Sequence, residues 1–180
     1  KIRRYISPIS SVSADGTRAA MATTGTGFTL IDVSDPANLV AHATVSPAAG
    51  QWSGLSVREV IVSGSTLYAI CENAGALSYD ISNLDSPVLT GYDPALDVQP
   101  ASPPYYIFNE GVLAGGKLYL SHWSGLVPGC VILDASTGDM DYLGRTPGYD
   151  YIRDIDEEDG FLYACTGHFG IVAHEHVSEF

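Results

Sequence analysis

One short segment recurs four times along this chain, and each copy ends in an acidic residue followed by turn-forming residues. The copies are Gly27–Pro36 (GFTLIDVSDP), Gly75–Asn83 (GALSYDISN), Gly129–Thr137 (GCVILDAST) and Gly170–Ser178 (GIVAHEHVS). A two-residue signal for a tight hairpin precedes each copy, at Asp15-Gly16, Ser63-Gly64, Gly115-Gly116 and Asp159-Gly160. Two landmarks that keep their register through four units predict a chain built from four structural repeats.

The length and strand content of the repeat indicate the architecture. The turn glycines at positions 16, 64, 116 and 160 lie 48, 52 and 44 residues apart, a spacing typical of propeller blades. Helical periodicity is absent, and Gly and Pro recur at turn spacing. We therefore expect an all-β protein, a β-propeller built from four repeats of about 44–52 residues. Its blades would span roughly 1–45, 46–92, 93–145 and 146–180 of a single domain, 1–180.

Each unit predicts four strands around the two landmarks. Inner strands are expected before the turns, at 57–62, 106–113 and 151–156, with a weaker counterpart near 5–12. Second strands are expected at 17–22, 65–70, 117–120 and 161–165, and fourth strands at 39–45, 88–92 and 142–145. Third strands should end at Asp32, Asp80, Asp134 and Glu175. The regular position of these acids indicates a scaffold role, in which each caps the turn that follows it.

The fourth unit stops at Phe180, directly after its expected third strand, so we expect this unit to lack a fourth strand of its own. Residues 1–6 (KIRRYI) could supply that strand and close a four-bladed ring. Alternatively, two chains could pair into an eight-bladed ring, or the 180 residues could be half of a larger propeller. Exposed strand edges promote aggregation, so we expect closure of some kind.

The third strand of the first unit and the turn after it, Leu30–Pro36 (LIDVSDP), resemble the LVIVD-repeat β-propeller family. Residues 65–70 (STLYAI) and 161–164 (FLYA) are similar to the Ala-Tyr part of that repeat. The resemblance covers all four units and is weakest at 173–176 (AHEH). It implies a propeller fold and a location outside the cytoplasm, whether secreted, periplasmic or on the cell surface. It assigns no activity, because members of this family usually have none known.

Charge and cysteine content exclude several classes of function. The net charge is −13, because residues 61–180 carry a net −14 and residues 1–60 a net +1. Nucleic acids and anionic membranes require basic surfaces, so neither is an expected partner. No apolar run is long enough to cross a membrane. The three cysteines lack zinc-binding spacing and are expected to be buried thiols, with one disulfide as the alternative.

Long connections should gather on the face opposite the glycine turns, and binding residues usually lie on such loops. Both tryptophans fall there, in residues 51–54 (QWSG) and 122–125 (HWSG). We expect a binding face for a protein, a glycan or a neighbouring subunit, formed by Trp52, His122, Trp123 and His168. Packing of the tryptophans beneath their own loops is the alternative.

A second set of candidates lies on the inner strands, which line the central channel of a propeller. The pairs Arg58-Glu59, Asn109-Glu110 and Arg153-Asp154 occupy equivalent places before the turn, where the first unit has Ser10 and Ser11. These side chains would ring the mouth of the channel. They either neutralise one another or form a polar pocket, in which Arg58 and Arg153 would clamp a carboxylate or phosphate group.

Motifs for catalysis and metal binding are sparse. The weak metal candidates are His168, His174 and His176, of which the last two share one strand face. Gly-x-Ser-x-Gly, Walker and His-Glu-x-x-His motifs do not occur. We therefore predict no cofactor and a non-enzymatic binding or structural module, able to self-associate through open propeller edges. The alternative is a hydrolase or lyase that uses a divalent cation, held by Glu59, Asn109, Glu110, Asp154 and His168.

Overall fold

The computed structural model describes residues 9–23, 25, 27–49, 52–72, 74–93, 107–122, 129–136, 139–146, 151–168 and 170–175. This part of the chain is all-β, as predicted, and its longer strands form four antiparallel sheets. Each sheet follows the chain order from strand to strand. No helix long and apolar enough to cross a membrane is found in the described ranges.

The strands agree with the four predicted repeats. The first sheet contains β1 (Ile9–Asp15), β2 (Arg18–Thr23), β3 (Gly27–Asp32) and β4 (Val40–Val45). The second contains β7 (Val57–Ser63), β8 (Thr66–Cys71), β9 (Gly75–Asp80) and β10 (Val88–Asp93). The third contains β11 (Phe108–Ala114), β12 (Lys117–His122), β13 (Val131–Asp134) and β14 (Tyr142–Arg145). The fourth has β15 (Ile152–Glu158), β16 (Phe161–Thr166) and β17 (Gly170–Glu175); a two-residue hairpin, β5 (Ala48–Ala49) and β6 (Trp52–Ser53), follows the first sheet.

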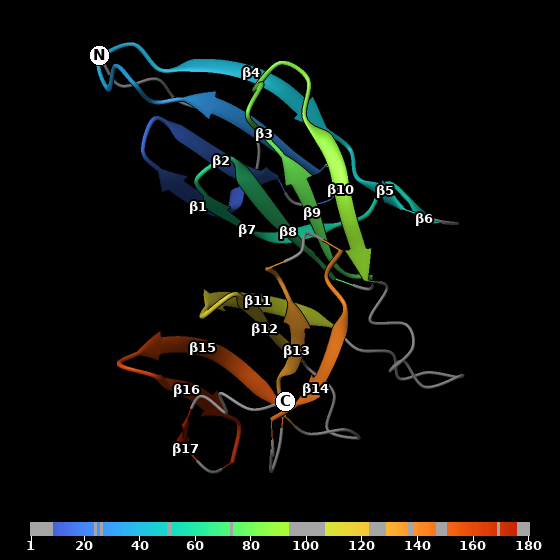
Figure 1. Ribbon diagram of the computed structural model, residues 1–180, viewed down its shortest axis with the longest axis vertical. Helices are drawn as coiled ribbons and strands as arrows, with labels where there is room; N and C mark the ends of the chain where they lie inside the picture. Colours follow the sequence, from blue (N-terminus) through green and yellow to red (C-terminus); the bar gives the residue numbers. More distant parts are fainter. Residues whose placement is uncertain are drawn as a thin grey trace.

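The four sheets form an arc (Figure 1), with the first sheet at the top and the fourth at the bottom. The innermost strands β1, β7, β11 and β15 lie toward the middle of the arc, and β4, β10 and β14 lie on its outer side. Consecutive sheets pack on each other through these innermost strands and their neighbours. Among the described residues, no comparable packing joins the first sheet to the fourth. The arc is therefore not closed into a ring by the strands that the structure describes.

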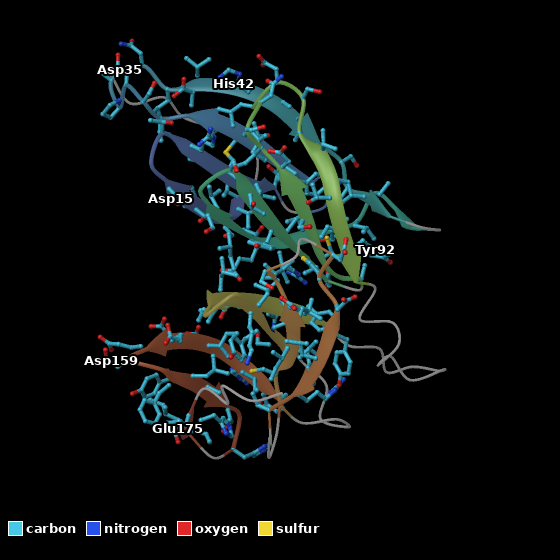
Figure 2. The ribbon with its side chains drawn as sticks, in the orientation of Figure 1. Asp15, Asp35, His42, Tyr92, Asp159 and Glu175 are labelled. Atoms are coloured by element: carbon cyan, nitrogen blue, oxygen red, sulfur yellow. The ribbon has the colours of Figure 1, made fainter. Side chains whose placement is uncertain are left out.

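In each of the first three sheets, two kinds of turn lie at the same end, as predicted. The two-residue hairpins use backbone conformations with positive φ, as at Gly16 (59°) and Gly64 (56°). The turn after the third strand bonds back to the hairpin: the N–H groups of Val33, Ile81 and Ala135 donate to the carbonyls of Thr17, Ser65 and Gly116. Figure 2 shows Asp15 and Asp35, one from each kind of turn, at the same end of the first sheet.

The acids that end the third strands cap those turns. One carboxylate oxygen of Asp32, Asp80 and Asp134 accepts the N–H group two residues later, in each case at 2.8 Å. Hydrogen bonds from the backbone N–H and the side chain of the serine at that position stabilise the ionised form and lower the pKa of all three carboxyls below 3.8; at Asp134 the side chain of Ser136 is the largest cause. The predicted scaffold role is therefore confirmed for these three positions.

The hydrophobic core is divided into clusters that lie between successive sheets. The first and second sheets enclose a cluster that includes Phe28, Leu30, Val60 and Tyr79, with the two rings edge to face at 5.1 Å. Similar clusters lie between the second and third sheets and between the third and fourth. Cys71 and Cys130 are free thiols inside this core, as expected, whereas the thiol of Cys165 is exposed.

Candidate functional site

The registers of the four innermost strands put one set of residues at equivalent places. Val12, Val60 and Ile155 pair with Met21, Ala69 and Ala164, and each of the three lies three residues before the end of its own strand. The residue just before each of these positions is Ser11, Glu59 or Asp154, and Glu110 precedes Gly111 in the third sheet. The equivalence expected from the sequence is therefore present in the strand pairing.

A pocket of about 500 Å³ opens at the middle of the arc and is lined by residues of all four innermost strands. Its lining residues are Ser10, Ser11, Val12, Arg58, Glu59, Asn109, Glu110 and Arg153. The structure thus brings together the residues expected at a channel mouth, with one serine pair, one Arg-Glu pair and one Asn-Glu pair from successive sheets. Asp154 does not line the pocket, but its carboxyl is hydrogen-bonded to that of Glu110.

Two carboxyl groups of this pocket are shifted toward their protonated forms. Burial raises the pKa of Glu59 from 4.5 to about 7, against the hydrogen bond that it accepts from the N–H of Gly111 at 2.5 Å. Burial and the hydrogen bond to Asp154 raise the pKa of Glu110 to about 7 as well. Near neutral pH both groups can therefore act either as donors or as acceptors of hydrogen bonds.

The two arginines of the pocket are held by residues that do not line it. The guanidinium of Arg58 pairs with Glu72 at 2.5 Å rather than with its neighbour Glu59. Arg153 donates to the hydroxyl of Tyr151 at 3.4 Å and lies over its ring, with 5.4 Å to the ring centre. The sequence interpretation missed Glu72 and Tyr151. Tyr151 was detectable, since residues two apart on a strand share a face; Glu72 follows β8 and carries no such signal.

His122 lies in the core and not on a binding face, which corrects the prediction. Its side chain is 0% exposed, edge-on to Phe108 with 6.2 Å between ring centres. Burial, together with the charge of Arg145, lowers its pKa to about 4. The reason is strand length: β12 was expected to end at residue 120 but continues to His122, which pairs with Phe108 inside the sheet.

The other residues of the predicted binding face are only partly covered by the structure. The backbone of Trp52 lies in β6, but its side chain is outside the described residues, as is the whole of Trp123. His168 is exposed in the turn between β16 and β17, where its ring meets Tyr151 edge-on at 5.8 Å. The tryptophan loops therefore remain a prediction.

The metal candidates are not brought together. His174 pairs with Leu162 near the far end of β17 from His168, and His176 lies outside the described residues. Within the described ranges no group of three His, Cys, Asp or Glu side chains has the geometry to hold a metal ion. The histidines that the structure describes therefore form no zinc-type cluster, and a cation at the channel mouth stays a prediction.

Comparison with known proteins gives the fold and no more. No protein-family model matches the chain, and no curated protein sequence matches it significantly. The computationally designed Ika4 protein is similar in structure, with a TM-score of 0.67 and 8% identity over 97% of this chain and 95% of that one. Apo AztD from Citrobacter koseri has a TM-score of 0.60 and 17% identity, over 95% of this chain and 45% of its own.

A third similar structure is the extracellular domain of the hybrid two-component system BT4673 from B. thetaiotaomicron. Its TM-score is 0.59 at 14% identity, over 96% of this chain and 21% of that one. The chain thus spans nearly all of Ika4, less than half of AztD and about a fifth of the BT4673 domain. Together with the four successive antiparallel sheets, these likenesses establish a propeller-like all-β fold.

Proposed function

We propose that this chain is a propeller module that binds a polar ligand in the central pocket and carries out no reaction on it. The observation that carries the proposal is the pocket itself, about 500 Å³, to which all four innermost strands contribute side chains. Ligand sites of globular proteins are typically concave and few, with a small number of converging polar groups. Here the converging groups come from the rigid scaffold of the sheets.

The lining indicates the chemistry of the ligand. Ser10, Ser11 and Asn109 offer neutral donors and acceptors, and Glu59 and Glu110 can do the same because they are near half protonation at neutral pH. Arg58 and Arg153 add charged donors at the edge. Such a mixture suits a ligand rich in hydroxyl groups better than one with a strong single charge. A saccharide unit of a glycan is the class that fits.

A glycan array followed by calorimetry with the best saccharide tests this proposal. We expect saturable binding that falls at least tenfold in Asn109→Ala, which removes two donors and one acceptor from the pocket wall. Asn38→Ala, at an exposed turn of the first sheet, is the matched control and should bind like the wild type. Absence of binding to any saccharide, or equal loss in the control, would refute a saccharide site in this pocket.

We also propose that the chain belongs with the LVIVD-repeat propellers and acts outside the cytoplasm. The sequence of Leu30–Pro36 (LIDVSDP) supports membership of this family. A location outside the cytoplasm is supported by the same resemblance and by the similar extracellular domain of BT4673. The tryptophan loops at Trp52 and Trp123 would then extend the binding surface beside the pocket to a protein, a glycan or a neighbouring subunit.

A second candidate function is catalysis. The observation that favours it is the pair Glu59 and Glu110, both with pKa values near 7, where a general acid or base is most effective. A hydrolase or lyase of this kind would hold a divalent cation beside these carboxyls and Asp154. Calorimetric titration with Ca²⁺ or Mn²⁺ alone decides the point: saturable binding that is lost in Glu110→Gln supports this candidate, and no heat of binding excludes the cation.

A further inference from the structure

The innermost strands of neighbouring sheets are linked by one repeated hydrogen bond. On each innermost strand, a side-chain oxygen at one fixed position accepts a hydrogen bond from the innermost strand of the next sheet. The donor is the backbone N–H of the residue one position after the equivalent of the acceptor. The acceptor and donor pairs are Ser11 and Val60 (3.4 Å), Glu59 and Gly111 (2.5 Å), and Glu110 and Ile155. This contact is thus part of how each sheet fixes the position of the next.

Asp154 occupies the acceptor position on the fourth sheet, directly before Ile155 in the shared register. Among the described residues no fifth sheet follows to supply a donor. At the other end of the arc, Val12 occupies the donor position on the first sheet, where no earlier sheet faces it. The side chain of Val12 is 70% exposed, which is unusual for valine in the middle of a strand.

Two more acceptors make the fourth sheet resemble the first. In the contact between the first two sheets, Ser13 accepts the N–H of Val62 at 3.0 Å and Asp15 accepts the N–H of Gly64 at 2.7 Å. The equivalent positions of β15 are Asp156 and Glu158, opposite Tyr163 and Phe161. In the second sheet one of these positions is the apolar Ile61, and in the third both are apolar, Val112 and Ala114. Only β1 and β15 carry oxygen acceptors at all three places.

Aromatic side chains beside these acceptors also match those that the second sheet buries against the third. Tyr68 on β8 faces the third sheet, is 5% exposed and donates its hydroxyl to the carbonyl of Ala135 there. Tyr163 holds the same register position on β16 but is 39% exposed. Phe161 and Ile171 lie on the same outward face and are also exposed. The fourth sheet therefore presents the residues that the second sheet uses to hold its neighbour, with nothing from the described chain on top of them.

We propose that the outward face of the fourth sheet binds the innermost strand of the first sheet of a second copy of this chain. The first and fourth sheets of one chain lie at opposite ends of the arc (Figure 1), so a second copy rather than the same chain meets this face. Their hairpin turns, marked by Asp15 and Asp159 in Figure 2, lie on the same side of the arc, as sheets in one ring require. Two such contacts related by a twofold axis close a ring of eight sheets.

The register then assigns the hydrogen bonds across each contact. Asp154, Asp156 and Glu158 of one copy accept the N–H groups of Val12, Ala14 and Gly16 of the other, as Ser11, Ser13 and Asp15 do within the chain. Val12 and Ile9 would pack beside Tyr163. In the first sheet, the side chains of Ala19, Met21 and Ile31 are already buried, and Val33 and Leu39 pack against them. The innermost strand, with Val12 exposed, is therefore the part of this sheet that a partner can reach.

The solution mass, measured by light scattering over a concentration series, tests the proposal. A chain of 19.1 kDa predicts a species of twice that mass. A mass that stays at 19.1 kDa at every concentration means closure within one chain or an open arc, and overturns the proposal. Growth beyond two copies with concentration overturns the closed ring.

Two matched variants locate the contact. Val12→Glu places a carboxylate against Asp154 and Asp156 of the second copy and should shift the mass to that of one chain. Val88→Glu makes the same change at a 57% exposed valine on the outer strand β10 and should leave the two-copy mass unchanged. Thermal unfolding of both variants checks that the fold survives. A two-copy Val12→Glu protein, or a dissociated Val88→Glu protein, places the contact elsewhere and overturns the proposal.

Discussion

Replacement of Glu59 by glutamine isolates the cost of placing a carboxylate in the middle of the arc. Burial raises the pKa of Glu59 from 4.5 to about 7. The folded protein therefore prefers the protonated side chain, so its contribution to stability is complete below pH 4.5 and is lost as the pH rises through about 7. Glutamine has the same shape and an oxygen that still accepts the N–H of Gly111, but it does not ionise.

The expected magnitude follows from the pKa. One pKa unit corresponds to about 1.4 kcal/mol, so the rise from 4.5 to about 7 sets an upper limit of about 3.5 kcal/mol. Water reaches the half-buried side chain, and screening reduces the expected effect to about 2 kcal/mol. Between pH 4 and pH 8, Glu59→Gln should therefore gain about 2 kcal/mol in unfolding free energy relative to the wild type.

Urea unfolding of both proteins at equal concentration, in steps from pH 4 to pH 8, measures this difference. Other titrating groups are present in both proteins and cancel to first order. Glu175→Gln, at an exposed side chain of β17, controls for removing one negative charge from an acidic chain and should show no comparable change with pH. If the wild type and Glu59→Gln give parallel stability curves, the carboxylate of Glu59 is not desolvated and the reasoning fails.

Three further predictions concern the scaffold, and all are measured by urea unfolding at neutral pH. Gly129→Ala should cost at least about 2 kcal/mol, because φ is +99° and a Cβ would clash with the carbonyl oxygen of Thr146; Gly54→Ala, with open space around it, should cost clearly less. Tyr68→Phe should cost about 1 kcal/mol, since Ala135 loses a buried donor, and an equal cost for Tyr163→Phe would contradict this cause. Asp134→Ala should destabilise the turn at Ser136 and Asp134→Asn should restore much of the loss; equal effects of the two would rule out capping.

The order of the strands was predictable because each repeat carries its own local signals. A hairpin pair with positive φ at Gly16 or Gly64 fixes where two strands meet, and an acid that caps the next turn fixes where the third strand ends. These signals act over a few residues and do not depend on the rest of the molecule. For that reason the residues before each turn could also be aligned between repeats. The alignment predicted that Arg58, Asn109 and Arg153 lie together, and all three line the pocket.

Side-chain partners were not predictable in the same way. Arg58 was expected among the carboxylates of the channel mouth, but it bonds to Glu72, whose position depends on how β8 leaves the second sheet. His122 was misplaced because nothing in the sequence around residues 120–122 shows that β12 continues for two more residues. Such contacts depend on how strands and loops are placed relative to one another, and a pattern of residue types does not specify that placement.

Differences between the repeats give information that their likeness does not. Equivalent positions in the interior of the arc need only one acceptor per contact, because Ile61 and Val112 pack there against a neighbouring sheet. The polar residues Asp156 and Glu158, at the same places on β15, have no such sheet to cover them among the described residues. Further exposed apolar side chains on this face, beside Phe161, Tyr163 and Ile171, would promote aggregation, whereas acceptors matched to one set of N–H groups favour one partner. The divergence of the fourth repeat is therefore what we expect of a face selected to meet the first sheet and to reject other strands.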